Sequence, residues 1–294
     1  MNSQLDTNLK NLKLGFFGSP QIAVWVLEEL EKSGLLPSLV VTNPDAPQGR
    51  KMILTETPVA QWASSRKIRT MKPTTLRDNS IEEELKQSSC DLFVVAAYGK
   101  IIPENILNIP KYKTINMHPS LLPKLRGASP IRSAILEDMN PTGISIMILT
   151  AGMDEGPILA QEEILIPKEA WPIRGNELDE LLAKRGGELL AKTILDWILG
   201  NIPPKEQAHV EATYSTKIIK EMGLIDLAGD PYQNLLKIRA FDGWPGTYFF
   251  TEKAGKQVRI KIIDAHLADD GTLQITRIIP EGKKEMSFED FMRS

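Results

Sequence analysis

Three polar residues in the middle of the chain, Asn116, His118 and Asp154, have the side chains that an acyl-transfer site requires. An amide can donate a hydrogen bond to a developing oxyanion, an imidazole can carry a proton, and a carboxylate can orient that imidazole. No covalent nucleophile is evident beside them, so the attacking group has to come from a substrate. The three residues therefore predict direct transfer of an acyl group to an amine.

The local sequence places these residues where such chemistry is expected. Asn116 and His118 alternate at the end of a short apolar run, which predicts a strand with both side chains on one face. Asp154 follows another apolar run and lies in a loop between Gly152 and Gly156. Taken alone, the loop favours a turn aspartate with no catalytic role. Its pairing with His118 is the argument for function.

The elements around the site alternate between apolar runs and helical patterns through the first two thirds of the chain. Strands are predicted at 13–17, 38–42, 91–97 and 114–117, with a strand pair at 142–149 and 158–166; helices are predicted at 20–32, 57–66, 79–88, 128–137 and 175–199. This alternation predicts an α/β fold, a doubly wound and mostly parallel sheet with helices on both faces. Ligands bind beyond the carboxyl ends of the strands in such sheets, where Asn116 and His118 lie.

The pattern changes after the long helix, in a polar, proline-bearing stretch. A helix at 231–240 and short strands at 247–250, 257–265 and 273–279 follow, separated by turn signals. They predict a small, partly open β-barrel of the OB type. The expected organisation is a flexible N-terminal extension (1–12), a catalytic domain (13–200), a linker (201–212) and a C-terminal β-barrel domain (213–294).

Composition excludes several classes of protein. The net charge of −3 over 294 residues gives no general affinity for nucleic acid, and residues 210–294 hold 12 Lys and Arg against 13 Asp and Glu. One cysteine, Cys90, excludes internal disulfides and cysteine-based zinc sites, and three scattered histidines predict no metal site. Without a signal peptide or a long apolar run, we expect a cytoplasmic protein that does not contact membranes. We also expect it to act as a monomer.

Two further segments and two histidines leave alternatives open. The turn-rich stretch 43–51 contains Arg50 and Lys51, which suit either an arm that contacts an anionic partner or a solvated surface loop. The stretch 15–20 is either a phosphate contact or a tight turn that opens a helix. His209 and His266 are interpreted as surface or packing residues. Cations near the proposed site in sequence are candidates for phosphate contacts: Arg50, Lys51, Lys111, Lys113, Lys124, Arg126 and Arg132.

The segment 116–123, Asn-Met-His-Pro-Ser-Leu-Leu-Pro, together with 126–127 and 152–156, resembles the formyltransferase family that uses 10-formyltetrahydrofolate. The resemblance implies that Asn116 and His118 stabilise the oxyanion and that Asp154 assists proton transfer. It also implies that the folate side of the pocket is formed by Ser120, Leu121, Leu122 and Pro123.

Other segments indicate a branch within this family. The stretch 42–51 resembles the inserted loop of the branch that formylates methionyl-tRNA, with Arg50 at the position of the arginine that approaches the acceptor end of the tRNA. Segments in 213–217, 244–246 and 286–291 resemble the C-terminal domain of that branch. The resemblance implies formyl transfer to the α-amino group of initiator methionyl-tRNA for translation initiation, with Arg50, Lys51 and the C-terminal domain contributing to tRNA binding.

Three alternatives remain at this point. A sugar-nucleotide formyltransferase would use the same three catalytic residues, and so would a hydrolase of formyltetrahydrofolate. A non-catalytic RNA-binding module with a β-barrel would not need them, and their joint presence argues against it.

Overall fold

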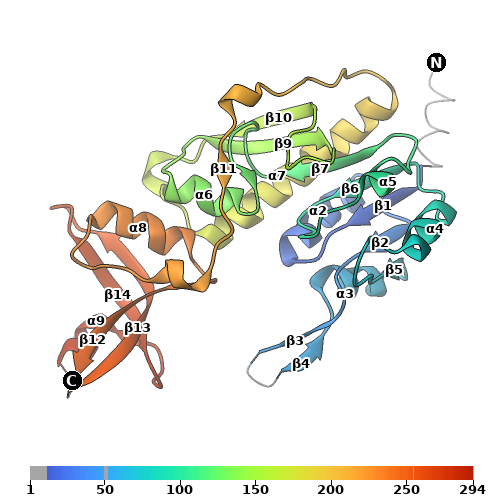
Figure 1. The fold of residues 1–294 in the computed structure, drawn as a ribbon. Helices are drawn as coiled ribbons and strands as arrows, with labels where there is room; N and C mark the ends of the chain where they lie inside the picture. The colour runs from blue at the N-terminus through green and yellow to red at the C-terminus, as the bar shows by residue number, and fades with distance from the viewer. Residues whose placement is uncertain (1–11, 50–51, 254, 294) are drawn as a thin grey trace. The chain divides into compact units, whose positions relative to one another are not determined.

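The computed structural model describes residues 12–49, 52–253 and 255–293 (Figure 1). The chain divides into two compact units, and each is discontinuous in sequence. The first unit comprises Met1–Arg126, Gly143–Glu163 and Glu180–Tyr214, and the second comprises Gly127–Thr142, Ile164–Asp179 and Ser215–Ser294.

A seven-stranded sheet forms the centre of the first unit, in the order β10-β9-β7-β6-β1-β2-β5. Its strands are β1 (Leu14–Phe17), β2 (Leu39–Val41), β5 (Arg69–Met71), β6 (Leu92–Val95), β7 (Thr114–His118), β9 (Thr142–Ile148) and β10 (Ile158–Ile164). The strands from β5 to β7 pair in parallel, and β9 joins β7 antiparallel. The expected doubly wound, mostly parallel sheet is confirmed.

Helices cover both faces of this sheet. The helices α4 (Asn79–Gln87) and α5 (Glu104–Leu107) supply Leu85 and Ile106 to a core that includes Phe17 and Phe93. On the other face, α7 (Gly175–Ile198) approaches Met117 of β7 through its glycine pair and also packs on α2 (Gln21–Lys32). Each such apolar side chain contributes about 1.5–3 kcal/mol when it is buried. Packing on both faces holds β7 in position, including its carboxyl end, where Asn116 and His118 lie.

A short hairpin replaces the loop that was expected at 43–51. It consists of β3 (Ala46–Gln48) and β4 (Ile53–Thr55), next to the helix α3 (Pro58–Ser65). Lys72 ties the two ends of the hairpin together, because its ammonium lies 2.6 Å from Asp45 and 2.8 Å from Glu56. Burial opposes the charge of Lys72, but these hydrogen bonds hold its pKa above the ordinary value. Three-residue strands are too short to show an alternating pattern in sequence.

The second unit contains an antiparallel sheet in the order β12-β13-β14-β15. Its elements are α6 (Pro130–Leu136), α8 (Pro231–Ala240), β12 (Thr247–Lys253), β13 (Lys256–Leu267), β14 (Leu273–Pro280), β15 (Met286–Ser287) and α9 (Phe288–Arg293). A bulge bends β13 between Ile262 and Asp264. The core beneath the sheet includes Phe249, Ile260 and Ile278. These strands are consistent with the small barrel that was expected.

The remaining elements are short. A two-stranded sheet pairs β8 (Arg126–Gly127) with β11 (Tyr214–Ser215). Single turns of 3-10 helix occur at Lys168–Ala170, His209–Glu211 and Lys220–Gly223. Within the described ranges, no helix is long and apolar enough to cross a bilayer.

Candidate active site

Asn116 and His118 both lie on β7, at the edge where the parallel strands end. Asn116 pairs in register with Val95, the last residue of β6, so the side chain of His118 projects at the carboxyl end of the sheet. Alternation along the strand puts both side chains on one face. Both are buried, with 8% and 4% of their surface exposed. The structure thus brings these two residues together where an α/β sheet normally binds its ligand.

The imidazole of His118 is held from two sides. Its Nε2 lies 2.9 Å from the carbonyl oxygen of Leu125, and because a carbonyl only accepts, Nε2 carries the hydrogen. Its Nδ1 lies 3.7 Å from a carboxylate oxygen of Asp154, which is ion-pair distance and longer than a hydrogen bond. With Nε2 occupied, Nδ1 is the atom at which the ring takes up or releases a proton, and it faces the carboxylate.

The amide of Asn116 is available to a ligand. Its side chain makes no hydrogen bond to any residue within the described part of the chain, although the residue is almost wholly buried. A buried amide normally has partners, so a free one at the end of a strand can donate to a bound group. A donor fixed in place before the reaction is what oxyanion stabilisation requires.

Tight packing determines the shape of the loop that carries Asp154. Asp154 has a left-handed backbone with φ of 50°, which is uncommon for a residue other than glycine. At Gly156, a Cβ atom would fall 1.9 Å from the carbonyl oxygen of Ile148, so only glycine fits. The carbonyls of Asp154 and Gly156 both accept from Nε2 of Gln207, at 2.9 and 2.7 Å. The loop is therefore a built structure and not a flexible turn.

The segment from Ser120 to Pro123 is also fixed by side-chain hydrogen bonds. The hydroxyl of Ser145 on β9 donates to the carbonyl of Ser120 at 2.7 Å and accepts from the amide of Leu122 at 3.0 Å. Gln161 on β10 donates to the carbonyl of Leu122 at 2.8 Å. The Leu122–Pro123 peptide is cis, and Leu122 packs in a small apolar cluster. Leu121 lies against Gly143.

Gln207 was not recognised as part of the site from the sequence, and Arg126 was recognised with a different role. Arg126 was expected among the cations that contact phosphate, but it is 1% exposed and donates to Oε1 of Gln207 at 3.1 and 2.7 Å. Arg132 is likewise paired with Asp179 at 2.7 Å. The expectation of a phosphate contact is wrong for Arg126, since its guanidinium is inside the protein. His209 is exposed, as expected, and its Nδ1 lies 3.2 Å from Arg126.

The segment 15–20 is a tight turn. The amide of Gly18 donates to the carbonyl of Val41 at 3.1 Å, and a Cβ atom at Gly18 would lie 2.8 Å from the carbonyl oxygen of Ala96. Ser19 bonds to the next segment through Thr42 and the amide of Asn43. The packing supports the structural alternative. Arg50 and Lys51 lie outside the described residues.

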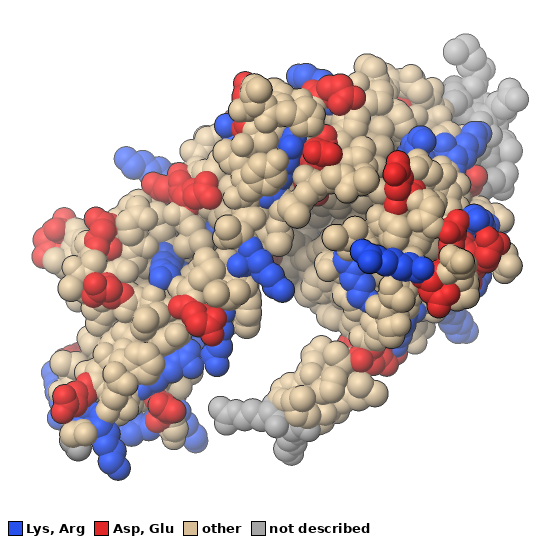
Figure 2. Space-filling model, in the orientation of Figure 1, with Lys and Arg blue, Asp and Glu red and all other residues tan. Residues whose placement is uncertain are grey.

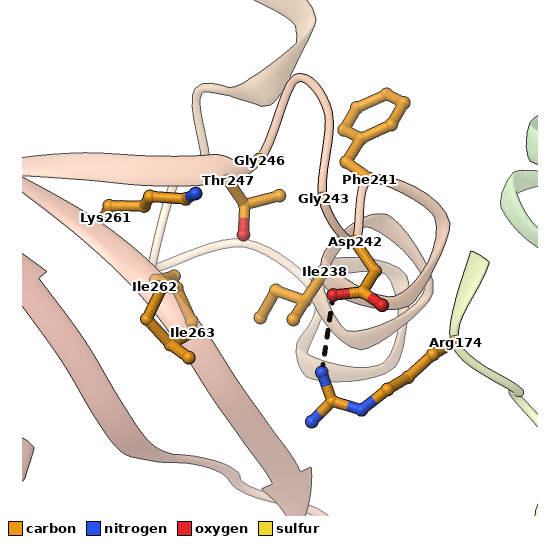
Figure 3. Close-up of a pocket in the computed structure, with 10 residues that line it drawn as sticks. All are labelled: Arg174, Ile238, Phe241, Asp242, Gly243, Gly246, Thr247, Lys261, Ile262 and Ile263. Carbon is orange, nitrogen blue, oxygen red and sulfur yellow. Dashed lines mark hydrogen bonds and ion pairs between the residues drawn. The ribbon is translucent and has the colours of Figure 1, made fainter. Parts of the chain in front are cut away.

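A separate pocket lies within the second unit (Figure 3). It is bordered by α8, the turn after it, and the strands β12 and β13, and its volume is about 200 Å³. Arg174 lies 3.5 Å from Asp242 at its edge. Cavities that enclose small-molecule ligands are usually about 300–1,000 Å³, and this one contains none of the residues predicted from the sequence. Both basic and acidic side chains lie on the visible face of the second unit (Figure 2).

The sequence was compared with families of known proteins. A family model described as formyl transferase matches residues 12–180, which include Asn116, His118 and Asp154. The chain belongs to the formyl transferase family. Among the described residues, no group of three or more His, Cys, Asp or Glu side chains could hold a metal ion.

Individual relatives match almost the whole chain. A methionyl-tRNA formyltransferase of Rickettsia bellii is 34% identical over 303 residues, covering 96% of this chain and 96% of the relative. One of Bacillus mycoides is 36% identical over 304 residues, covering 96% and 95%. The match therefore extends through the second unit.

Solved structures share the fold at low identity. An N-formyltransferase of Helicobacter canadensis, in complex with folinic acid and dTDP-3-aminofucose, superposes with a TM-score of 0.63 at 19% identity, over 88% of each chain. A methionyl-tRNA formyltransferase of Clostridium thermocellum superposes with a TM-score of 0.58 at 18% identity, over 94% of this chain and 99% of that one. These likenesses establish the fold and do not discriminate between acceptors.

Proposed function

We propose that this protein transfers the formyl group of 10-formyltetrahydrofolate to the α-amino group of initiator methionyl-tRNA, for translation initiation. The observation that carries this proposal is the match to methionyl-tRNA formyltransferases at 34–36% identity over 96% of the chain. The family's shared site accounts for the folate donor. A match that continues through the second unit supports the tRNA acceptor, because the donor chemistry alone does not require that unit.

The reaction is a direct displacement at the formyl carbon. The neutral α-amine attacks, a carbon–nitrogen bond forms, and the formyl oxygen becomes an oxyanion. The free amide of Asn116 donates to that oxyanion, and His118 contributes to its stabilisation. Collapse of the intermediate breaks the bond to N10 of the folate, and the proton lost by the amine passes to N10.

His118 and Asp154 serve the movement of that proton. In the arrangement described, Nδ1 is the position on the ring that exchanges a proton, and the carboxylate of Asp154 stabilises the charge that appears there. The distance of 3.7 Å suits a proton that passes directly or through one bound water. Asp154 in this role assists the transfer and does not become the base itself.

Separate parts of the chain bind the two substrates. Ser120, Leu121, Leu122 and Pro123 form the folate side of the pocket, supported by the rigidity of this segment. Arg50 and Lys51 contact the tRNA. Residues 13–200 supply the catalytic domain, residues 201–212 a linker, and residues 213–294 a β-barrel domain that contributes to tRNA binding. The enzyme acts as a monomer in the cytoplasm, where its charged tRNA substrate is made.

The test is formyl transfer from 10-formyltetrahydrofolate to purified methionyl-tRNA. A 4-amino-sugar nucleotide and a reaction without acceptor are run beside it, and the formylated products are separated. Transfer to the tRNA alone is the expected result. Transfer to the sugar, or release of formate without acceptor, would retain the site and overturn the proposed acceptor. Absence of all turnover with retained tRNA binding would favour a non-catalytic RNA-binding protein.

A further inference from the structure

The segment 207–213, which was expected to lie in the linker (201–212) except for Thr213 at the start of the C-terminal domain, makes hydrogen bonds to both loops that hold the His118–Asp154 pair. We propose that Gln207 and Thr213 are positioning residues of the active site, which set the separation of the imidazole and the carboxylate. This inference rests on the proposed function, because it assigns a task to residues that act through His118 and Asp154.

Gln207 holds the carboxylate side. Its side chain is buried, with 5% of the residue exposed: Nε2 donates to the carbonyls of Asp154 and Gly156, and Oε1 accepts two bonds from Arg126. A primary amide is the one side chain that can donate to two carbonyls and accept from a guanidinium at once. The left-handed backbone of Asp154 is therefore held from outside its own loop.

Thr213 holds the imidazole side. Its hydroxyl accepts from the amide of Leu125 at 2.9 Å, and its carbonyl accepts from the amide of Arg126 at 2.9 Å. Leu125 has φ of 56°, a strained value for leucine, and its carbonyl is the acceptor for Nε2 of His118. The orientation of the imidazole thus depends on a backbone that Thr213 keeps in place.

Arg126 connects the two sides. Its backbone amide bonds to Thr213 and its guanidinium bonds to Gln207, so a shift of this segment would move both loops together. Displacement of a catalytic group by about 1 Å can cost about a hundredfold in rate. A positioning role therefore predicts an effect on kcat and little effect on KM.

The first variant is Gln207→Glu, which keeps the bonds from Arg126 and removes the donors to Asp154 and Gly156. A carboxylate oxygen then faces two carbonyl oxygens, and the loop must move. We expect kcat for formyl transfer to fall by roughly ten- to a hundredfold, with KM for both substrates changed less than about threefold. The lost donors should lower the urea midpoint of unfolding, but because Arg126 stays paired the variant should remain folded under the conditions of the assay. Gln61→Glu, on the exposed face of α3, is the matched control and should keep full activity.

The second pair of variants tests the imidazole side. Thr213→Val keeps the shape and leaves the amide of Leu125 without its acceptor, whereas Thr213→Ser restores a hydroxyl. We expect Thr213→Val to lower kcat by roughly tenfold and Thr213→Ser to recover most of that loss. Equal loss in both variants would show that packing of the methyl group matters and would overturn the assignment of Thr213.

A double-mutant cycle separates positioning from general damage. If Gln207 acts through Asp154, then Gln207→Glu should cost less than about threefold in kcat when Asp154 is already alanine. Full additivity would overturn the inference, as would unchanged kcat in Gln207→Glu alone. The proposed site fails separately: if Asp154→Ala and His118→Ala retain wild-type kcat, the assignment of those two residues is wrong and the inference falls with it.

Discussion

At the scale of single residues, the free amide of Asn116 is the most direct link between the structure and the chemistry. It is buried at the strand end, and it has no protein partner within the described ranges to compete with a ligand. Asn116 is held in the sheet between Val95 of β6 and Met147 of β9, which fixes where its side chain lies. An amide in this setting gains strength from its surroundings, because low polarity increases the energy of each hydrogen bond to a charge.

Replacing Asn116 by alanine should therefore damage the chemical step and not the binding of substrates. We expect kcat to fall by about 10²–10³-fold, as when one oxyanion donor is removed from other enzymes. Single-turnover formyl transfer to methionyl-tRNA measures this step without product release. Asn116→Asp, which turns a donor into an acceptor, should be at least as impaired. A kcat within about threefold of wild type for Asn116→Ala would show that the oxyanion is stabilised elsewhere.

A second residue, Tyr98, tests burial in the apolar core that packs on this sheet. The hydroxyl of Tyr98 is buried without a hydrogen-bond partner among the described residues, and burial raises the pKa of this phenol to about 12. Tyr98→Phe should keep or increase the free energy of unfolding, because it removes an unsatisfied polar group. The unfolded phenol ionises near pH 10 and the folded one near pH 12, so the wild type alone should lose stability as pH rises through this interval.

Urea denaturation of both proteins at pH 8 and pH 11 checks this expectation. The advantage of Tyr98→Phe should be larger at pH 11. Destabilisation of the variant by more than about 1 kcal/mol at pH 8 would show that the hydroxyl has a partner, such as a buried water.

At the scale of elements, the sequence predicted the strands and helices that have a clear hydrophobic period. The strand containing Asn116 and the long helix after residue 174 were located within one or two residues, since apolar runs and helical spacing are local signals. The hairpin of β3 and β4 was missed because its strands have three residues each and mostly exposed side chains. Gln207 was missed because its partners are 81 and 53 positions away, and no local pattern indicates such contacts.

A substitution at Ser145 tests whether the segment that contains Ser120 and Leu122 forms the folate side of the pocket. Its buried hydroxyl links that segment to β9 and also accepts from Gln161 at 2.8 Å. Ser145→Ala leaves these partners unsatisfied and should lower the free energy of unfolding by about 1–3 kcal/mol. If the segment forms the folate side, KM for 10-formyltetrahydrofolate should rise while KM for methionyl-tRNA stays constant. Ser65→Ala, on α3, serves as the control for loss of a hydroxyl that bonds within its own helix.

An equal rise in both Michaelis constants for Ser145→Ala would contradict a role confined to the folate side. Unfolding in urea and the two KM values are independent readouts. Loss of stability with both KM values unchanged would place the segment away from the folate.

At the scale of the whole molecule, the chain passes more than once between its two compact units. The helix α6 packs in the second unit beside α8, about a hundred residues later in the sequence, and Arg132 on α6 bonds to Asp179 there. The polar, proline-bearing stretch after residue 200 predicted a boundary between two domains. Contacts between segments that are distant in the sequence, such as α6 with α8, leave no pattern in a single sequence that could predict them. The network of Arg126 and Gln207 belongs to the same class of long-range contact.

Charge is the property of the whole molecule that constrains how it holds a tRNA. The net charge is −3 and the region 210–294 has 12 basic against 13 acidic residues, so phosphate contacts must be few and local. Each contact contributes about 0.9 or less to the slope of log affinity against log salt. We expect KM for methionyl-tRNA to rise with KCl along a shallow slope, while kcat and KM for the folate change little.

Arg50→Ala should raise KM for methionyl-tRNA, spare KM for the folate, and reduce the salt slope by about one, since one phosphate contact is lost. The measurement is initial-rate kinetics between about 50 and 300 mM KCl, a range in which screening changes strongly. Gln48→Ala, on β3 and two residues before Arg50 in the sequence, removes no charge and should leave the slope unchanged. An unchanged slope in Arg50→Ala would mean that Arg50 does not contact a phosphate, and a salt-independent KM in the wild type would mean that acceptor binding depends on uncharged contacts.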